Sequence, residues 1–230
     1  MATQRLSGLG CMNFLLPQLF EARATSITSS PDQRSKVDAA VAHVRVFAVR
    51  VGARDHVAAA IGAAAHELLM NAMYDAPVDD AGNPWYAHDR RQHVHLRGRE
   101  IPTLHAVADA RKLGLQVIDR FGGLHRERVL SSLIRGLSGR TSGRSVVDTS
   151  WGGAGLGLLQ CYRAASSLII DVIPRISTHV SLMYDLKMSV RESRNVPTSI
   201  HMGEGSTASG PGGPPGRALV GRLQVAPSAG

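Results

Sequence analysis

The chain has 230 residues and a mass of 24.5 kDa, which is enough for one domain of ordinary size with tails. Hydrophobic residues make up 43% of it but aromatic residues only 4%, so the core has to be built from Ala, Leu, Val and Ile. The formal net charge of +8 suits a nucleotide, a nucleic acid or an acidic protein surface, and equally a merely Arg-rich composition. No aromatic-interleaved basic strand and no zinc-ligand spacing accompanies the charge, so we expect no nucleic-acid partner.

The two cysteines, Cys11 and Cys161, form neither a metal motif nor a disulfide scaffold, which favours a reduced, cytoplasmic location. The apolar stretch over residues 9–20 is interrupted by Asn13 and Pro17 and is too short to span a bilayer. It also lacks the charged start and small-residue cleavage site of a signal peptide. We therefore expect a cytoplasmic protein without membrane contact.

The first part of the chain predicts an N-terminal segment followed by two helices. In residues 1–36, the stretch 11–20 can pair as an edge strand, and 24–36 is typical of a loop. An apolar stripe of Val and Ala predicts a helix over 37–51, which Gly52 ends. A second helix is expected from Asp55 to about Tyr74. The Pro- and Gly-containing loop over 77–84 is either a surface connection or an insertion near a binding mouth.

The second part of the chain changes to a period of two. It predicts strands over 93–97, 104–108 and 113–119, with the last two joined as a hairpin. Helices are expected over 124–137 and from the glycines at 152–157 to about residue 166, followed by strands over 168–173 and 179–186. Residues 138–149 have little to bury. Residues 191–230 are rich in Gly, Pro and Ser and predict a disordered tail, either passive or carrying a docking peptide.

Glu67 and Asn71 carry the first candidate chemistry, on the second predicted helix. They are four residues apart, so their side chains leave one face of that helix, a turn apart. A carboxylate and an amide on one edge of an otherwise apolar helix can hold a hydrated cation and orient a water. The alternative is that the two side chains are simply its solvated edge.

Two glycine-containing stretches follow. Val117-Ile118-Asp119-Arg120-Phe121-Gly122-Gly123 places an aspartate after a strand, which by itself also suits a plain Asp-Gly turn. Gly153-Ala154-Gly155-Leu156-Gly157-Leu158 opens a helix, where glycines let the backbone approach an anion and the free N–H groups point at it. No strand with a short turn precedes these glycines, so they do not match a dinucleotide-binding motif, and the Gly-Lys-Ser/Thr of a P-loop is absent.

Together, in this order, the three stretches resemble the ATP-binding module of the GHKL superfamily, which includes gyrase, heat-shock chaperone, histidine-kinase and mismatch-repair ATPases. The resemblance covers about residues 37–186 and is nearest to stand-alone anti-sigma-factor serine kinases, since no dimerisation segment bearing a phosphorylatable His precedes the module. It implies an α+β fold of the Bergerat type, a two-layer sandwich with a mixed, mainly antiparallel sheet and helices on one face. It also implies an ATP-binding domain over 37–190, between the N-terminal segment 1–36 and the tail 191–230.

The resemblance further implies roles for single residues. Glu67 would be the general base and Asn71 the ligand of a magnesium ion that bridges the phosphates. Asp119 would accept a hydrogen bond from the adenine amino group, which favours ATP over GTP because a carboxylate repels the guanine oxygen. The remaining nucleotide contacts would come from Gly123, Gly153, Gly155, Leu156, Gly157 and Thr178. Residues 138–150 would form the lid over the ATP, with Arg140 and Arg144 either reaching the phosphates or solvated.

The sequence departs from the family pattern at one position of the second stretch. Phe121 stands where Asp-x-Gly-x-Gly has its first glycine, while Gly123 keeps the second. Two functions therefore stay open. One is an ATP-dependent regulator of bacterial signalling, either a serine/threonine kinase acting on a sigma factor, an anti-sigma antagonist or another signalling protein, or an ATP-driven switch, with a homodimer as an option. The other is a non-catalytic protein-interaction module on the same fold, with weakened nucleotide binding.

Overall fold

The computed structural model describes residues 19–20, 24–87, 89–138, 154–189, 198–205 and 218–221. In the element names below, α is an α-helix, β a strand and η a short helix of another type; η2 is a π-helical turn and η3 a 3-10 turn. The elements run in the order β1 (Thr25–Ser29), α2 (Arg34–Arg50), α3 (Asp55–Met70), η2 (Asn71–Asp75), η3 (Gly98–Glu100), β2 (Thr103–Ala108), β3 (Lys112–Asp119), α4 (Arg126–Ser138), α5 (Ala154–Ala164), β4 (Ser167–Ile173), β5 (Ser177–Asp185), β6 (Ser199–Glu204) and β7 (Ala218–Gly221).

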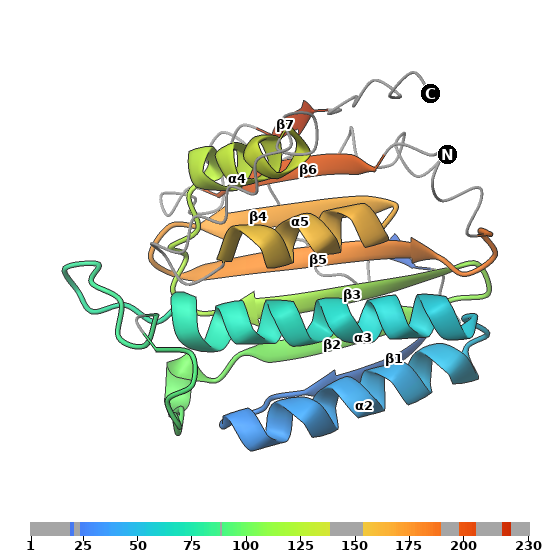
Figure 1. Cartoon of the computed structure of the whole chain (residues 1–230), viewed down its shortest axis with the longest axis horizontal. Coiled ribbons are helices and arrows are strands. Elements are labelled where there is room, and N and C mark those ends of the chain that lie inside the picture. The colour runs from blue at the N-terminus through green and yellow to red at the C-terminus, as the bar shows by residue number, and fades with distance from the viewer. Residues whose placement is uncertain are drawn as a thin grey trace, which may run out of the picture.

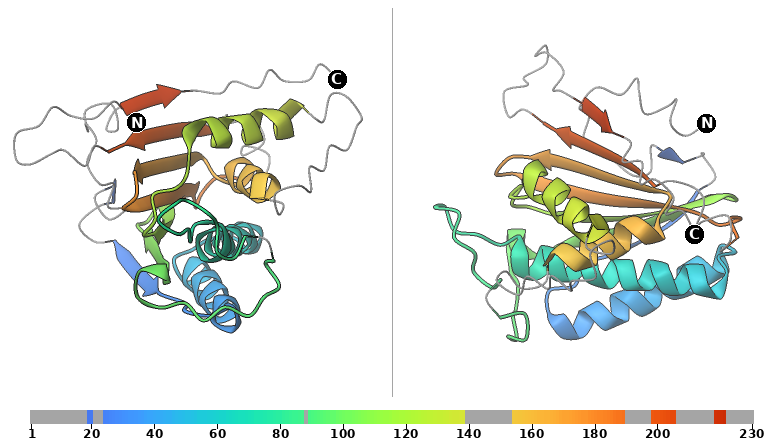
Figure 2. Two further views of the ribbon diagram at one scale, coloured as in Figure 1. Left: turned by 90° about the vertical axis from the view of Figure 1, so that its left-hand side faces the viewer. Right: turned by 45° about the horizontal axis from the view of Figure 1, so that its top comes forward.

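The strands form one sheet in the order β1-β2-β3-β5-β4-β6-β7. Every pair of neighbours in this sheet is antiparallel except β4 and β6, which are parallel. The helices lie on one face of the sheet (Figure 1), and the end-on view in Figure 2 shows the two layers separately. The predicted α+β class, a two-layer sandwich with a mixed and mainly antiparallel sheet, is therefore confirmed.

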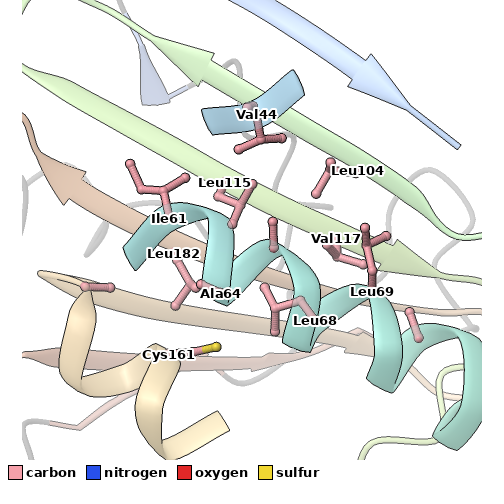
Figure 3. Packing of buried hydrophobic residues seen from close by; sticks show 14 of the residues in the cluster. Val44, Ile61, Ala64, Leu68, Leu69, Leu104, Leu115, Val117, Cys161 and Leu182 are labelled. Carbon is pink, nitrogen blue, oxygen red and sulfur yellow. The ribbon is translucent and has the colours of Figure 1, made fainter. Parts of the chain in front are cut away.

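The core lies between the helix layer and the sheet. The helix α3 packs against α2, α5 and β3, and α5 packs on β4 and β5. Small residues such as Ala64 let α3 approach its neighbours closely, while Ile61 and Leu68 fill the space towards Leu115 and Leu182 of the sheet (Figure 3). Aliphatic side chains dominate this core, as the low aromatic content predicts.

The two long helices follow the predicted stripes. The buried residues of α2 recur at helical spacing, and they are Val37, Ala40, Val44, Phe47 and Ala48. The chain leaves α2 through Gly52, whose φ of +95° few other residues adopt.

At the end of α3 the hydrogen bonding widens by one residue over Asn71–Asp75, and the Ala76 amide donates to the Asn71 carbonyl at 3.0 Å. Such π-helical turns recur at functional sites.

Three predicted segments differ from the structure. Residues 93–97 do not join the sheet. They make a single bridge between His95 and Gln33, and the Leu96 amide donates to the Asp32 carbonyl at 2.7 Å, so this backbone is held by the residues just before α2. Val94 and Leu96 are buried in the core, which gives this stretch its strand-like alternation without a ladder. The edge strand β1 lies at 25–29, inside the stretch expected to be a loop, where its Thr and Ile side chains favour pairing with β2. Of the edge strand expected at 11–20, residues 11–18 lie outside the described residues, and residues 19–20 belong to no strand.

The sheet also extends into the predicted tail. Residues 199–204 pair with β4 as β6, and 218–221 pair with β6 as β7, which corrects the expectation of disorder for these two stretches. Ile200 is buried in the core, so this strand has apolar surface to contribute despite its Gly- and Ser-rich surroundings. The domain boundaries 1–36, 37–190 and 191–230 stay predictions.

Candidate functional site

The C-terminal end of α3, the start of α5, the end of β3 and the start of β5 meet at one end of the sandwich, on the left in Figure 1. Here Glu67 lies directly against Gly157. A Cβ atom added to Gly157 would overlap the Glu67 carboxylate, so the glycine is what allows α5 to pass this side chain. The first and third predicted stretches, ninety residues apart in the chain, are therefore in contact.

Cys161, one turn further along α5, is buried near the same carboxylate. Burial, and then the charge of Glu67, raises the pKa of its thiol to about 12. The thiol is thus a neutral part of the core at physiological pH and offers no nucleophile to the site. Gly157 and Cys161 lie on one face of α5, and that face looks towards Glu67.

Asn71 begins the π-helical turn, and its side chain is engaged by an arginine from the long loop that follows. The Asn71 Oδ1 atom accepts a hydrogen bond from Arg90 Nη2 at 3.1 Å. The same guanidinium forms an ion pair with Asp75, in which Nε donates to Oδ1 at 3.3 Å and Nη2 donates to Oδ2. Burial raises the pKa of the Asp75 carboxyl, Arg90 counteracts this, and Glu67 adds to the rise.

Asp119 closes the turn at the end of β3. Its Oδ1 atom accepts hydrogen bonds from the amides of Phe121 at 2.9 Å and Gly122 at 3.3 Å. Thr178 faces it from the neighbouring strand β5. Burial raises the pKa of the Asp119 carboxyl, while the turn amides and Thr178 counteract it. A partly buried carboxylate at a strand end, with one oxygen fixed by the backbone, is suited to accept a hydrogen bond from a donor on a ligand.

Of the paired glycines after Asp119, the first is the one that the fold requires. Gly122 has a φ of +62°, and a Cβ there would overlap the Ile173 carbonyl and the amides of Arg175 and Ile176 in the β4–β5 turn. Gly123, which matches the family pattern, is exposed and has open space around its Cα. The Arg175 amide also donates to the Gly122 carbonyl at 3.4 Å. The Asp119 turn is therefore locked to the β4–β5 turn by Gly122.

Phe121 is 5% exposed, and residues of the long loop cover it. Its ring meets Trp85 edge-on, with ring centroids 6.0 Å apart, and the Arg99 guanidinium lies 5.1 Å from its centroid. The phenyl ring therefore anchors the loop over residues 76–102 to the Asp119 turn. This same loop carries Arg90 to Asn71, so it joins the first and second predicted stretches.

The structure thus brings Glu67 together with Gly157, and Asp119 together with Thr178. Gly155 and Leu156 lie in the first turn of α5. Gly153, Arg140 and Arg144 lie outside the described residues. Sequence reasoning missed Arg90 and Gly122. The Gly-Gly pair after Asp119 is a sequence signal that could have indicated Gly122. Nothing in the local pattern distinguishes Arg90 from its neighbour Arg91.

Two hollows in the described part of the chain lie elsewhere. One, of about 180 Å³, lies at the opposite end of the sandwich between the start of α3 and the end of α5, and includes His56, Arg163 and Asp185. The other is a surface groove along α2 and the start of α3, lined by Arg45, Val46 and other residues. The residues that the structure describes contain no cluster of three His, Cys, Asp or Glu side chains able to hold a metal ion. None of their helices is long and apolar enough to cross a membrane.

Comparisons with known proteins found likenesses among solved structures alone. No family model matches the sequence, and the search of curated proteins found no match. Among solved structures, the chain is similar to a chain in the crystal structure of the SiaB-SiaC complex from Pseudomonas aeruginosa, with a TM-score of 0.42 and 16% identity over 69% of this chain and 88% of that chain. A likeness at this level carries no functional argument, and the resemblance to the GHKL superfamily stays a prediction.

Proposed function

We propose that this chain is an ATP-binding regulator of bacterial signalling, with its nucleotide site at the end of the sandwich where α3, α5 and β3 meet. The observation that carries the proposal is the contact between the Glu67 carboxylate and Gly157. It brings a candidate base to the helix start that is suited to phosphate groups. Asp119 and Thr178 at the adjoining strand ends are suited to the adenine.

The chemistry follows from the donors and acceptors on these elements. The free N–H groups at the start of α5 and the positive end of its dipole would bind the phosphates. Asp119 would accept from the adenine amino group through the carboxylate oxygen that does not serve the turn. Glu67 would take the proton of an attacking hydroxyl group, on a serine or threonine of a protein partner or on water, while that oxygen bonds to the γ-phosphorus and the bond to the β-phosphate breaks.

A protein partner belongs to this proposal. A sigma factor, an anti-sigma antagonist or another signalling protein would receive the phosphoryl group or respond to the nucleotide. A homodimer is a further arrangement to test.

The second candidate function is a protein-interaction module that binds nucleotide weakly. It is favoured by the packing of Phe121 under Trp85 and Arg99, which fills space beside the Asp119 turn. A module of this kind would hold its partner with equal affinity whether or not ATP is present.

A thermal unfolding experiment with matched aspartate variants separates the two. Asp109 makes the same type of turn as Asp119 at the opposite end of β3, with its Oδ1 accepting from the amides of Arg111 and Lys112, both at 2.9 Å. We expect ATP to stabilise the wild-type chain and Asp109→Asn, by about 2.7 kcal/mol at 100 times the dissociation constant, but not Asp119→Asn. GTP should have little effect. If ATP stabilises neither the wild type nor the control, the nucleotide-binding function is refuted and the interaction module is supported.

A further inference from the structure

The guanidinium of Arg90 binds the side-chain oxygens that a nucleotide-bound metal ion would use as ligands, beginning with that of Asn71. It binds the amide oxygen of Asn71 and both carboxylate oxygens of Asp75. The side chains of Arg90 and Asp75 are only 21% and 26% exposed, so this ion pair is partly withdrawn from water. Partial burial strengthens the pair relative to a surface salt bridge and fixes its geometry.

The backbone around Arg90 is held from two sides. Its carbonyl accepts a hydrogen bond from Arg34 Nη1 of α2 at 2.7 Å. Two residues later, the Gln92 carbonyl accepts from the hydroxyl of Tyr74, which is fully buried in the π-helical turn, at 2.7 Å. The packing of the loop therefore fixes the backbone of Arg90 beside Asn71, so the side chain starts from a defined position.

A magnesium ion fits this arrangement poorly. It requires near-octahedral oxygen coordination, and it gives up its waters reluctantly. The candidate ligand oxygens, on Asn71 and Asp75, already accept hydrogen bonds from Arg90. The positive charge of the guanidinium would also repel a divalent cation beside it. Arg128 of α4 adds a second positive charge that acts on Asp75, against the negative charge of Glu67.

We propose that Arg90 takes the place of the metal ion in this site, so that the chain binds ATP without a divalent cation. This inference rests on the proposed function. The guanidinium has five donor hydrogens, and those on Nη1 form no hydrogen bond with the residues that the structure describes. They remain available to a phosphate oxygen, which guanidinium groups bind in a favourable planar geometry. Arg90 would then neutralise phosphate charge from a position that Asn71 and Asp75 fix.

The test compares ATP binding to the full chain in EDTA and in excess magnesium, by isothermal titration calorimetry. We expect the wild type to bind ATP with the same affinity, within about threefold, in both conditions. The double variant Arg90→Gln/Asp75→Asn removes both charges and leaves no buried carboxylate unpaired. It should lose about 10- to 100-fold in metal-free affinity, as expected for a charge-assisted hydrogen bond, and regain part of it with magnesium. Arg91→Gln, at the exposed neighbouring position, should behave as the wild type.

The outcomes distinguish this inference from the proposed function. A wild type that binds ATP tenfold or more tightly with magnesium than in EDTA overturns the role of Arg90 and leaves the ATP site intact. A double variant with unchanged metal-free affinity overturns it as well. A wild type that binds no ATP in either condition refutes the proposed function, and the inference with it. Circular dichroism of each variant separates a loss of binding from a loss of fold.

Discussion

Replacing Gly157 by alanine tests the contact on which the site depends. An alanine inside a helix is normally more stable than a glycine, by about 0.5–1 kcal/mol, because the unfolded chain has less freedom to lose. Here the new Cβ would overlap the Glu67 carboxylate. The glutamate would have to turn away, at a cost of about 0.5–1.5 kcal/mol for a displaced rotamer. The two terms nearly cancel, so we expect the single variant to differ little from the wild type in stability.

The coupling appears when Glu67 is also shortened. In the Glu67→Ala background the overlap is gone, so Gly157→Ala should then stabilise the chain. The four chains of this double-mutant cycle should show an interaction free energy of about 1 kcal/mol, measured from urea unfolding at constant m-value. Gly62→Ala serves as the control, since its Cβ would meet Arg45 instead, and it should add independently to Glu67→Ala. An interaction free energy below about 0.3 kcal/mol for Gly157 would refute the contact.

Three further predictions concern the Asp119 turn. Gly122→Ala should lower the free energy of unfolding by more than about 2 kcal/mol, because the positive φ and three close backbone atoms exclude a Cβ. Gly123→Ala should change the free energy of unfolding, measured in urea, by less than about 0.5 kcal/mol. Equal effects of the two variants would contradict the packing. Phe121→Ala should cost about 3–5 kcal/mol and change Trp85 fluorescence, and an unchanged emission spectrum would contradict the ring contact. Burial raises the pKa of Asp119 above its ordinary 3.8. Between 3.8 and the raised pKa, the folded chain keeps a proton that the unfolded chain has lost, so the free energy of unfolding falls as the pH rises through this range. Asp119→Asn should flatten this part of the curve of unfolding free energy against pH, and an unaltered slope would contradict the assignment.

The local patterns were enough to predict most of the helix layer and the central hairpin. A helix has to present one apolar stripe to the core, so the spacing of Val37 and Val44 already indicates which face of α2 is buried. The period of two predicts β2 and β3 as strands, because successive side chains of a strand point to opposite faces, and the short turn between them predicts their pairing as a hairpin. The glycines at the start of α5 likewise predict a close contact of this backbone with another group, because glycine has no side chain to prevent it.

The partners across the fold were decided by tertiary structure alone. The residues 93–97 alternate like a strand, yet they stay outside the sheet: Val94 and Leu96 are buried in the core, and the backbone makes a single bridge to Gln33, just before α2. The strand β6 joins the sheet beside β4 through a parallel pairing that no local signal indicates.

Single contacts in the site follow the same rule. Glu67 and Asn71 were identified from their spacing on one helix face, because that spacing is a local property. That Asn71 accepts from Arg90, and that Phe121 packs under Trp85, depends on how a long loop folds back over the end of the sheet. Residue type and spacing along one element are set within a few residues of sequence. Which charge meets which oxygen is set by the packing of segments far apart in the chain, and so only the folded structure shows it.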